Sequence, residues 1–207
     1  MIDAAERLAA ERGIGAMSLR EVQAAAGQRN KSAAQYHFGS REGLIEAVIT
    51  SRMGPVNDRR LEMLAELPDA PALRELVEAL VEPLAAATVG RSGSCWARFL
   101  LQGWVDPTLE RVVRRSFEAS SFRTVRKLLL ASVDHLPEHL RAQRVDHAVG
   151  FVVMALAGAE MTAATRRRAA PPVDASVTEL VDSCCGLLLA PTSSDTELAD
   201  RRAAGGA

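Results

Sequence analysis

The chain has 207 residues, of which 48% are hydrophobic, 25% are charged and only 4% are aromatic. This length is ample for a hydrophobic core that needs no stapling by disulfides. Because the formal net charge is −1, the chain is no polycation, and any surface for nucleic acid must be local. Abundant Ala and Leu, with few runs that favour strands, predict an all-α protein.

The cysteines and the N-terminus bear on where the protein works. Cys95, Cys184 and Cys185 form no even framework of disulfides, which suits a reducing cytosol. The N-terminus is charged and amphipathic and lacks the apolar core of a signal peptide, and no uncharged apolar run reaches the roughly 18 residues of a membrane span. We therefore expect a cytoplasmic protein that is neither exported nor membrane-spanning.

Residues 1–50 carry the start and stop signals of three short helices and the beginning of a fourth. A capping-box pattern at Ser18 and Glu21 begins the second helix, and Ser40 is the expected N-cap of the fourth. Glycines end the first three helices, which are predicted over 2–12, from 19 to about 26, and over 31–38.

The rest of the chain is predicted to form longer helices separated by glycine and proline. Gly54 and Pro55 interrupt the pattern of the fourth helix, so we expect a kink or a break there, and a kink at Pro83. Residues 191–207 are polar or small and are expected to form a disordered tail. The later helices are predicted over 71–88, 95–105, 107–133, 137–166 and 174–189, which makes about nine helices in all.

Two short helices joined by a glycine-containing turn are the signature of a helix-turn-helix, whose second helix lies in the DNA major groove. The segment from Gly27 to Ser40 contains no Asp or Glu, as a surface facing phosphates requires. The alternative is an ordinary solvated helix, which is usually rich in Glu and Lys. The candidate contacts are, for base edges, Arg29, Asn30, Lys31, Ser32 and Gln35, and, for phosphate oxygens, Tyr36, His37 and Arg41.

Residues 2–49 resemble the N-terminal DNA-binding domain of the TetR family of transcriptional regulators. The resemblance rests on the A-x-x-L-x-x-E-R-G pattern over 5–13, the capped second helix, Ala26-Gly27 in the turn, the Tyr-His-Phe end of the third helix, and the run Ser40-Arg41-Glu42-Gly43-Leu44. It implies contacts to phosphates at the groove edges from Ser18 and Arg41, a backbone clamp by Tyr36 and His37, and base reading by residues 29–35.

The resemblance also implies a division of the chain, with a helix-turn-helix domain over 1–50 and a helical ligand-binding and dimerisation domain over 51–190. The interval from Gly27 to Phe38 is one residue longer than is usual in the family. Two registers of the turn therefore stay open, because Arg29 and Asn30 either precede the recognition helix or belong to it.

The last two long helices are the expected dimer interface. By the resemblance, they form a four-helix bundle with the same helices of a partner copy. The segments 148–164 and 176–190 agree with this, since they are apolar and rich in small residues that allow close approach of helices. The alternative is that these segments form the internal core of a monomer.

An aromatic stripe predicts where a ligand binds. Trp96, Phe99, Leu100 and Trp104 share one helical face, although such stripes are often plain core. We expect a mostly apolar ligand, with Glu160 as a polar partner. The following helices add the remaining candidates for this pocket, namely Phe117, Phe122, Phe151, Met154 and Met161.

An enzyme is not favoured. His135 and His139 match an H-x-x-E-H zinc string, but Pro137 separates them, so we expect no metal, no cofactor and no catalytic residue. The sequence therefore predicts a homodimeric regulator of double-stranded operator DNA, most simply a repressor that a small-molecule effector releases. The alternatives are an activator or ligand-independent regulator, and a helical binding module or enzyme whose N-terminal helices are only structural.

Overall fold

The structure, a computed structural model, describes residues 1–28, 33–107, 109, 112, 120–165, 172–196 and 198. Every element within these residues is helical, which confirms the all-α prediction. The nine α-helices and one 3₁₀ helix are α1 Ile2–Arg12, η1 Ile14–Ala16, α2 Leu19–Ala25, α3 Ala33–Phe38, α4 Arg41–Glu66, α5 Leu73–Ala87, α6 Trp96–Val105, α8 Ser120–Ser132, α9 Glu138–Thr165 and α10 Val173–Leu189.

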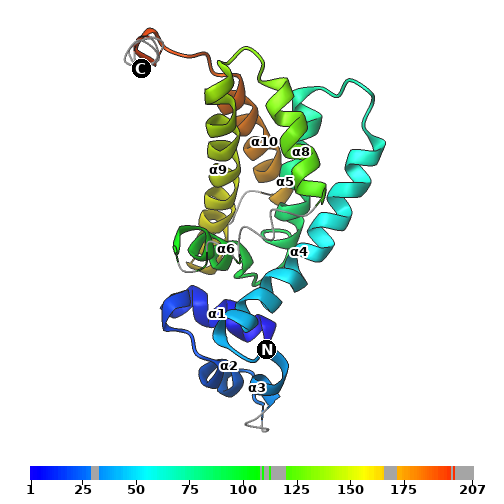
Figure 1. Cartoon of the computed structure of the whole chain (residues 1–207). Helices are drawn as coiled ribbons and strands as arrows, with labels where there is room; N and C mark the ends of the chain where they lie inside the picture. The colour runs from blue at the N-terminus through cyan, green and yellow to red at the C-terminus, as the bar shows by residue number, and fades with distance from the viewer. Residues whose placement is uncertain are drawn as a thin grey trace.

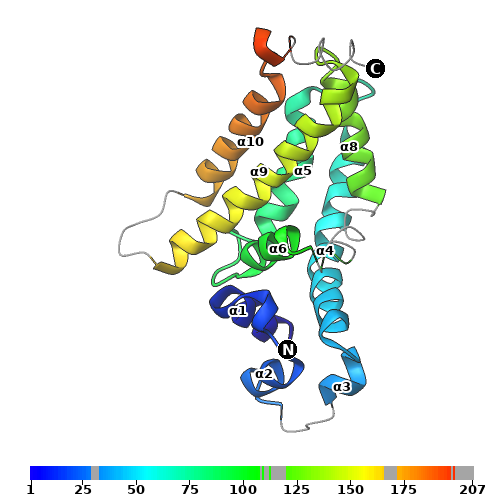
Figure 2. The ribbon, with the colours of Figure 1, turned by 60° about the vertical axis from the view of Figure 1, so that its left-hand side comes forward.

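The helices form two groups joined by α4 (Figure 1). Helices α1, α2 and α3 lie together at the lower end, and α5, α8, α9 and α10 form the upper bundle. Helix α6 lies between the groups and packs against both α1 and α9. The turned view shows α9 and α10 side by side along one edge of the bundle (Figure 2).

Side-chain caps begin the lower helices where the sequence predicts them. The Ser18 hydroxyl accepts a hydrogen bond from the Glu21 N–H at 3.3 Å, and the Glu21 carboxylate accepts from the Ser18 N–H at 3.1 Å. The Ser40 hydroxyl accepts from the Gly43 N–H at 3.0 Å and starts α4. Gly39 follows α3 at a φ of 67°, in the left-handed region that favours glycine at a helix end.

Helix α4 is continuous through Gly54 and Pro55, so the break that the sequence allowed does not occur there. Pro55 removes one N–H donor from the helix, but Met53 and Val56 on either side are buried in the core. Packing of this face outweighs the lost hydrogen bond. Pro83 likewise lies inside α5.

Two predicted segments are described only in part. Of the helix predicted over 107–133, α8 covers Ser120–Ser132, and residues 108, 110, 111 and 113–119 lie outside the described residues. Of the tail predicted over 191–207, residues 197 and 199–207 lie outside them as well.

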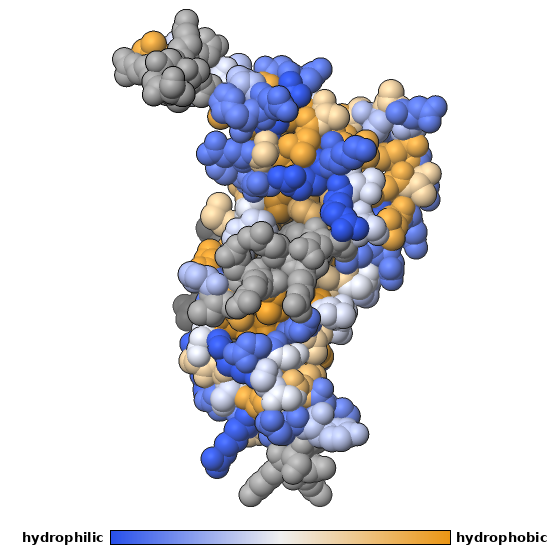
Figure 3. All heavy atoms as spheres, in the orientation of Figure 1, coloured by the Kyte–Doolittle hydropathy of each residue, from blue (hydrophilic) through white to orange (hydrophobic). Residues whose placement is uncertain are grey.

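One core runs through both groups, because buried residues of α1, α4, α5, α6, α8, α9 and α10 form a continuous cluster. Among the described helices, α9 alone has the length and composition of a membrane span. Its length and composition alone do not indicate that α9 crosses a membrane, since helices inside globular proteins share both properties. In the space-filling view, hydrophobic residues gather over the upper bundle, whereas the lower end is mostly hydrophilic (Figure 3).

Candidate functional site

Helix α3 lies at the lower end of the molecule and leads into α4 (Figure 2). Gln35, Tyr36 and His37 are all exposed, and Tyr36 is 86% exposed. The rings of Tyr36 and His37 meet edge to face, with 5.3 Å between their centroids. A large aromatic side chain held at the surface in this way is available for contact with another molecule.

Three of the predicted DNA contacts already make hydrogen bonds within the protein. Ser18 belongs to the capping box of α2, and the Gln35 amide donates to the carbonyl oxygen of Gly39 at 2.6 Å. Arg41 donates from Nη2 to the carbonyl oxygen of Ile14 at 2.8 Å. The predicted base-reading residues Arg29, Asn30, Lys31 and Ser32 lie outside the described residues.

The charge at the start of α2 is fixed by its cap. Hydrogen bonds from Ser18 hold the pKa of the exposed Glu21 carboxyl below its usual range. Glu21 is therefore ionised at neutral pH. Its negative carboxylate interacts favourably with the positive, N-terminal end of the α2 dipole. This places the acid on α2, while α3 presents none among its described residues.

The corner between α1 and η1 is tied to α6 by Gln102, a residue that the sequence did not single out. The N–H of Ile14 donates to Gln102 Oε1 at 2.6 Å, and Gln102 Nε2 donates to the carbonyl oxygen of Ala9 at 2.9 Å. Arg41 of α4 donates a hydrogen bond to the carbonyl oxygen of the same Ile14. Side chains of both α4 and α6 therefore bind the corner between α1 and η1.

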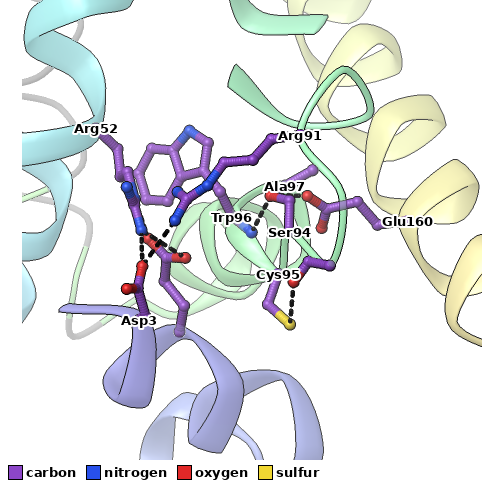
Figure 4. A network of polar contacts seen from close by, with 10 residues as sticks. Asp3, Arg52, Arg91, Ser94, Cys95, Trp96, Ala97 and Glu160 are labelled. Atoms are coloured by element: carbon purple, nitrogen blue, oxygen red, sulfur yellow. Dashed lines mark hydrogen bonds and ion pairs between the residues drawn. The ribbon is translucent and has the colours of Figure 1, made fainter. Parts of the chain in front are cut away.

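Ion pairs tie the start of α1 to the rest of the molecule (Figure 4). Arg52 of α4 pairs with both Asp3 and the buried Glu6, and Arg91, between α5 and α6, pairs with Asp3 at 2.9 Å. The hydrogen bond from Arg91, followed by Arg52, lowers the pKa of the Asp3 carboxyl. Helix α1 is thus held from two directions.

The residues predicted to line a ligand pocket differ in their burial. Trp96, Phe99, Leu100 and Phe122 are buried in the core, and the rings of Trp96 and Phe99 stack with 5.7 Å between centroids. Phe151 is half-buried and Trp104 is at the surface, while Met154 and Met161 on α9 are each 56% exposed. Phe117 lies outside the described residues.

A cavity of about 600 Å³ lies where α1, the α5–α6 connection, the end of α9 and the start of α10 meet. None of the nine predicted pocket residues lines it, although Glu160 does. Glu160 is buried, and its carboxylate accepts hydrogen bonds from the N–H groups of Ala97 and Arg98, both at 3.1 Å. It thereby caps the N-terminus of α6 (Figure 4).

Arg60 is a buried cation that the sequence analysis missed. It is 2% exposed, and its hydrogen bonds go to the carbonyl oxygens of Ala79 and Leu80, to Asn57 and to Ser121. All of these partners are neutral, and burial lowers the pKa of Arg60 to about 10. The described residues contain no group of three His, Cys, Asp or Glu side chains that could hold a metal ion.

Comparison with known proteins bears on the class of protein. Residues 1–48 match the family described as "Bacterial regulatory proteins, tetR family". FadR from Bacillus halodurans, described as a fatty acid degradation regulator, is 18% identical with a TM-score of 0.63, over 92% of this chain and 97% of that one. A search of curated protein sequences found no significant match.

Two further solved structures have the same fold. AmtR from Mycobacterium smegmatis is 14% identical with a TM-score of 0.61, over 93% of this chain and 86% of that chain. PfmR from Thermus thermophilus, described as a TetR family transcriptional regulator, is 16% identical with a TM-score of 0.56, over 93% and 98% of the two chains. At these identities, the likenesses establish the fold.

The fold and the exposed third helix define a DNA-binding regulator of the helix-turn-helix class. Residues 1–48 match the TetR family of bacterial regulatory proteins, and the chain as a whole has the same fold as the regulators FadR and PfmR. The resemblance drawn from the sequence motifs is therefore confirmed.

Proposed function

We propose that this protein is a homodimeric repressor in the cytoplasm, has no enzymatic activity, and leaves its operator when a small molecule binds. Residues 1–50 are the DNA-binding domain and residues 51–190 the effector and dimerisation domain. The observation that carries the proposal is the exposed face of α3, with Tyr36 almost wholly outside the fold in a domain of the TetR type.

DNA reading is proposed for the exposed side chains of α3 and the turn before it. Gln35 exchanges its bond to Gly39 for the edge of an adenine, whose two polar groups match an amide. Tyr36, His37 and Arg41 contact phosphates, and Ser18 does so at the groove edge. The proposal also assigns base contacts to residues 29–32.

Fluorescence anisotropy with a duplex from the flank of the coding region tests DNA binding. We expect affinity to fall steeply with salt, because phosphate contacts release counterions. Gln35→Ala is expected to lose preference for the duplex by about tenfold or more. Gln143→Ala, an exposed glutamine on α9, is the matched control. Salt-independent binding, or equal preference in Gln35→Ala and the control, contradicts the proposal and favours a binding module.

The dimer is proposed to form through the outer face of α9 and α10. Met154 and Met161 are exposed on α9, and Leu189 is exposed on α10. An added Cβ at Gly150, Gly158 or Gly186 meets nothing within 4 Å, so space lies open over these helices. Glycine inside a helix costs about 0.5–1 kcal/mol relative to alanine, and close approach of a partner helix offsets that cost.

Sedimentation of the purified protein tests the dimer. Met154→Arg places a charge in the proposed interface and is expected to give monomers at micromolar concentration. Leu61→Arg changes an exposed leucine on α4, away from this face, and is the control. A dimer that survives Met154→Arg, or that Leu61→Arg also breaks, contradicts the assignment of this interface.

The effector response is proposed to act on the distance between the two α3 helices of the dimer. Half-sites on DNA lie about 34–36 Å apart, so a dimer reads them only at a matching separation of its helices. A ligand with higher affinity for a wider separation shifts the population away from DNA. Of the nine residues predicted from the sequence, the buried or half-buried ones remain a proposal for an effector pocket in the interior of the domain. They are Trp96, Phe99, Leu100, Phe122 and Phe151.

A further inference from the structure

We propose that the cavity between α1, α6, α9 and α10 is a binding site for a small amphipathic carboxylate, with Arg98 as its anion-binding side chain. The volume of about 600 Å³ lies in the range of small-molecule sites. The site lies at the junction of the two helix groups. It shares none of the nine residues predicted for the aromatic pocket, although Glu160, the predicted polar partner, lines it.

The walls of the cavity differ in chemistry. Arginines from three segments line one side, from α1, the α5–α6 connection and α6. The opposite side, from α9 and α10, is mostly apolar. A molecule with an anionic group at one end and a compact apolar body matches this division. The arginines are Arg7, Arg91 and Arg98, and the apolar wall is Ala155, Leu156, Ala159, Val177 and Leu180.

Arg98 is poorly satisfied by the protein itself. Within the part of the chain that the structure describes, its guanidinium donates one hydrogen bond, from Nη2 to the Cys95 sulfur at 2.9 Å, and sulfur is a weak acceptor. Its Nε is buried and has no hydrogen-bond partner among the described residues. The guanidinium therefore has donor capacity left for charge-assisted hydrogen bonds to a carboxylate.

The neighbouring groups offset the charge of Arg98 only in part. Burial raises the pKa of the Cys95 thiol, so Cys95 is a neutral thiol at neutral pH. Glu160 forms an ion pair with Arg98 at 3.9 Å from its Nε and also accepts hydrogen bonds from two backbone N–H groups of α6. A second carboxylate, Glu11, lines the cavity on the α1 side. Arg7 is exposed on α1 and forms no ion pair with the other described residues. Arg7 therefore remains available to an anion, and Arg98 shares its charge with Glu160.

The position of the cavity gives binding a consequence for the lower helices. Arg7 and Glu11 come from α1, whereas the apolar wall belongs to the upper bundle. A ligand held by both groups favours the arrangement of α1 and α9 that suits it, and this regulatory consequence rests on the proposed effector response. Binding itself does not depend on that response.

Calorimetry with octanoate and octanamide tests the site, because the two probes match in length and differ in charge. We expect octanoate to bind at least about tenfold more tightly than octanamide, as hydrogen bonds to a charged group do. Arg98→Met is expected to weaken octanoate by about tenfold or more and to leave octanamide unchanged. Arg123→Met, an exposed arginine on α8, is the matched control and is expected to change neither.

A second variant tests the apolar wall. Ala159 lines the cavity and is exposed, so Ala159→Trp fills the space without disturbing the core. It is expected to abolish binding of both probes. The proposal is overturned if octanamide binds as tightly as octanoate, or if Arg98→Met or Ala159→Trp binds octanoate like the original protein. It is also overturned if no straight-chain carboxylate from acetate to decanoate binds at 10 mM. That concentration is about tenfold above the weak end of ordinary affinities.

The same samples separate this inference from the proposed function. Octanoate binding that depends on Arg98 but leaves duplex affinity unchanged supports the site and removes its regulatory role. Failure of the unliganded protein to bind any duplex contradicts the proposed function and leaves the calorimetric result on the site intact.

Discussion

The lower helices and the upper bundle differ in what determines their structure. In α1, α2 and α3, short helices begin at side-chain caps or end at glycine, and the polar face of α3 is left outside. In the upper bundle the helices are longer, and α9 has both buried and exposed apolar residues. Local signals therefore govern the first group, and packing governs the second.

The largest effect that sharpens this contrast is expected inside the bundle. Arg60→Ala removes a long buried side chain with four hydrogen-bond partners and leaves a cavity between α4, α5 and α8. The free energy of unfolding is expected to fall by about 3 kcal/mol, as for other large-to-small changes in a core. Urea denaturation measures it. Arg59→Ala, its exposed neighbour, is the control with at most about 1 kcal/mol, and equal effects contradict the role of burial.

The junction between the two groups comes next. Gln102→Met keeps the length of the side chain and removes its bonds to Ile14 and Ala9. A loss of about 1–3 kcal/mol in stability is expected, together with weaker duplex binding, because α1 loses its tie to α6. Thermal unfolding and anisotropy report the two effects. Gln143→Met is the control, and normal duplex affinity in Gln102→Met indicates that the lower group holds its position without α6.

A smaller effect is expected at the caps of the lower helices. Ser18→Ala removes the capping hydroxyl of α2 and is expected to cost about 1 kcal/mol. Hydrogen exchange measures the loss as faster exchange of the first N–H groups of α2. The exposed Ser51 lies inside α4, away from its N-terminus, so Ser51→Ala serves as the comparison. No change at α2 contradicts the importance of local caps in this group.

The smallest expected effect is on the stability of the protein at low pH. The native pKa of Asp3 is lowered by Arg91 and Arg52, so the ionised form contributes stability above its ordinary pKa. That contribution is lost as the pH falls through the lowered native pKa, below about pH 4. Asp3→Asn is expected to be slightly less stable at neutral pH and to show a flatter loss of stability in acid. Identical pH profiles of unfolding for the two proteins would show that these ion pairs contribute nothing.

The sequence by itself determined the features that depend on near neighbours in the chain. The caps at Ser18 and Ser40 and the glycine that ends α3 lie within a few residues of the groups that they satisfy. The absence of acid from α3 is also a property of the sequence. Such local hydrogen bonds need no tertiary structure to be recognised, and the match to the TetR family confirms what they indicated.

Only the tertiary structure decided which apolar residues are core, surface or cavity wall. The spacing of Trp96, Phe99 and Met154 describes helix faces, but not what each face packs against. Gln102 and Ile14 are 88 positions apart, and Arg98 meets Glu160 across 62. The helix-breaking effect of Pro55 yields in the same way to burial of its neighbours. Nonlocal packing energies exceed these local preferences. They therefore determine where the cavity lies, which cation is buried and whether α4 is continuous.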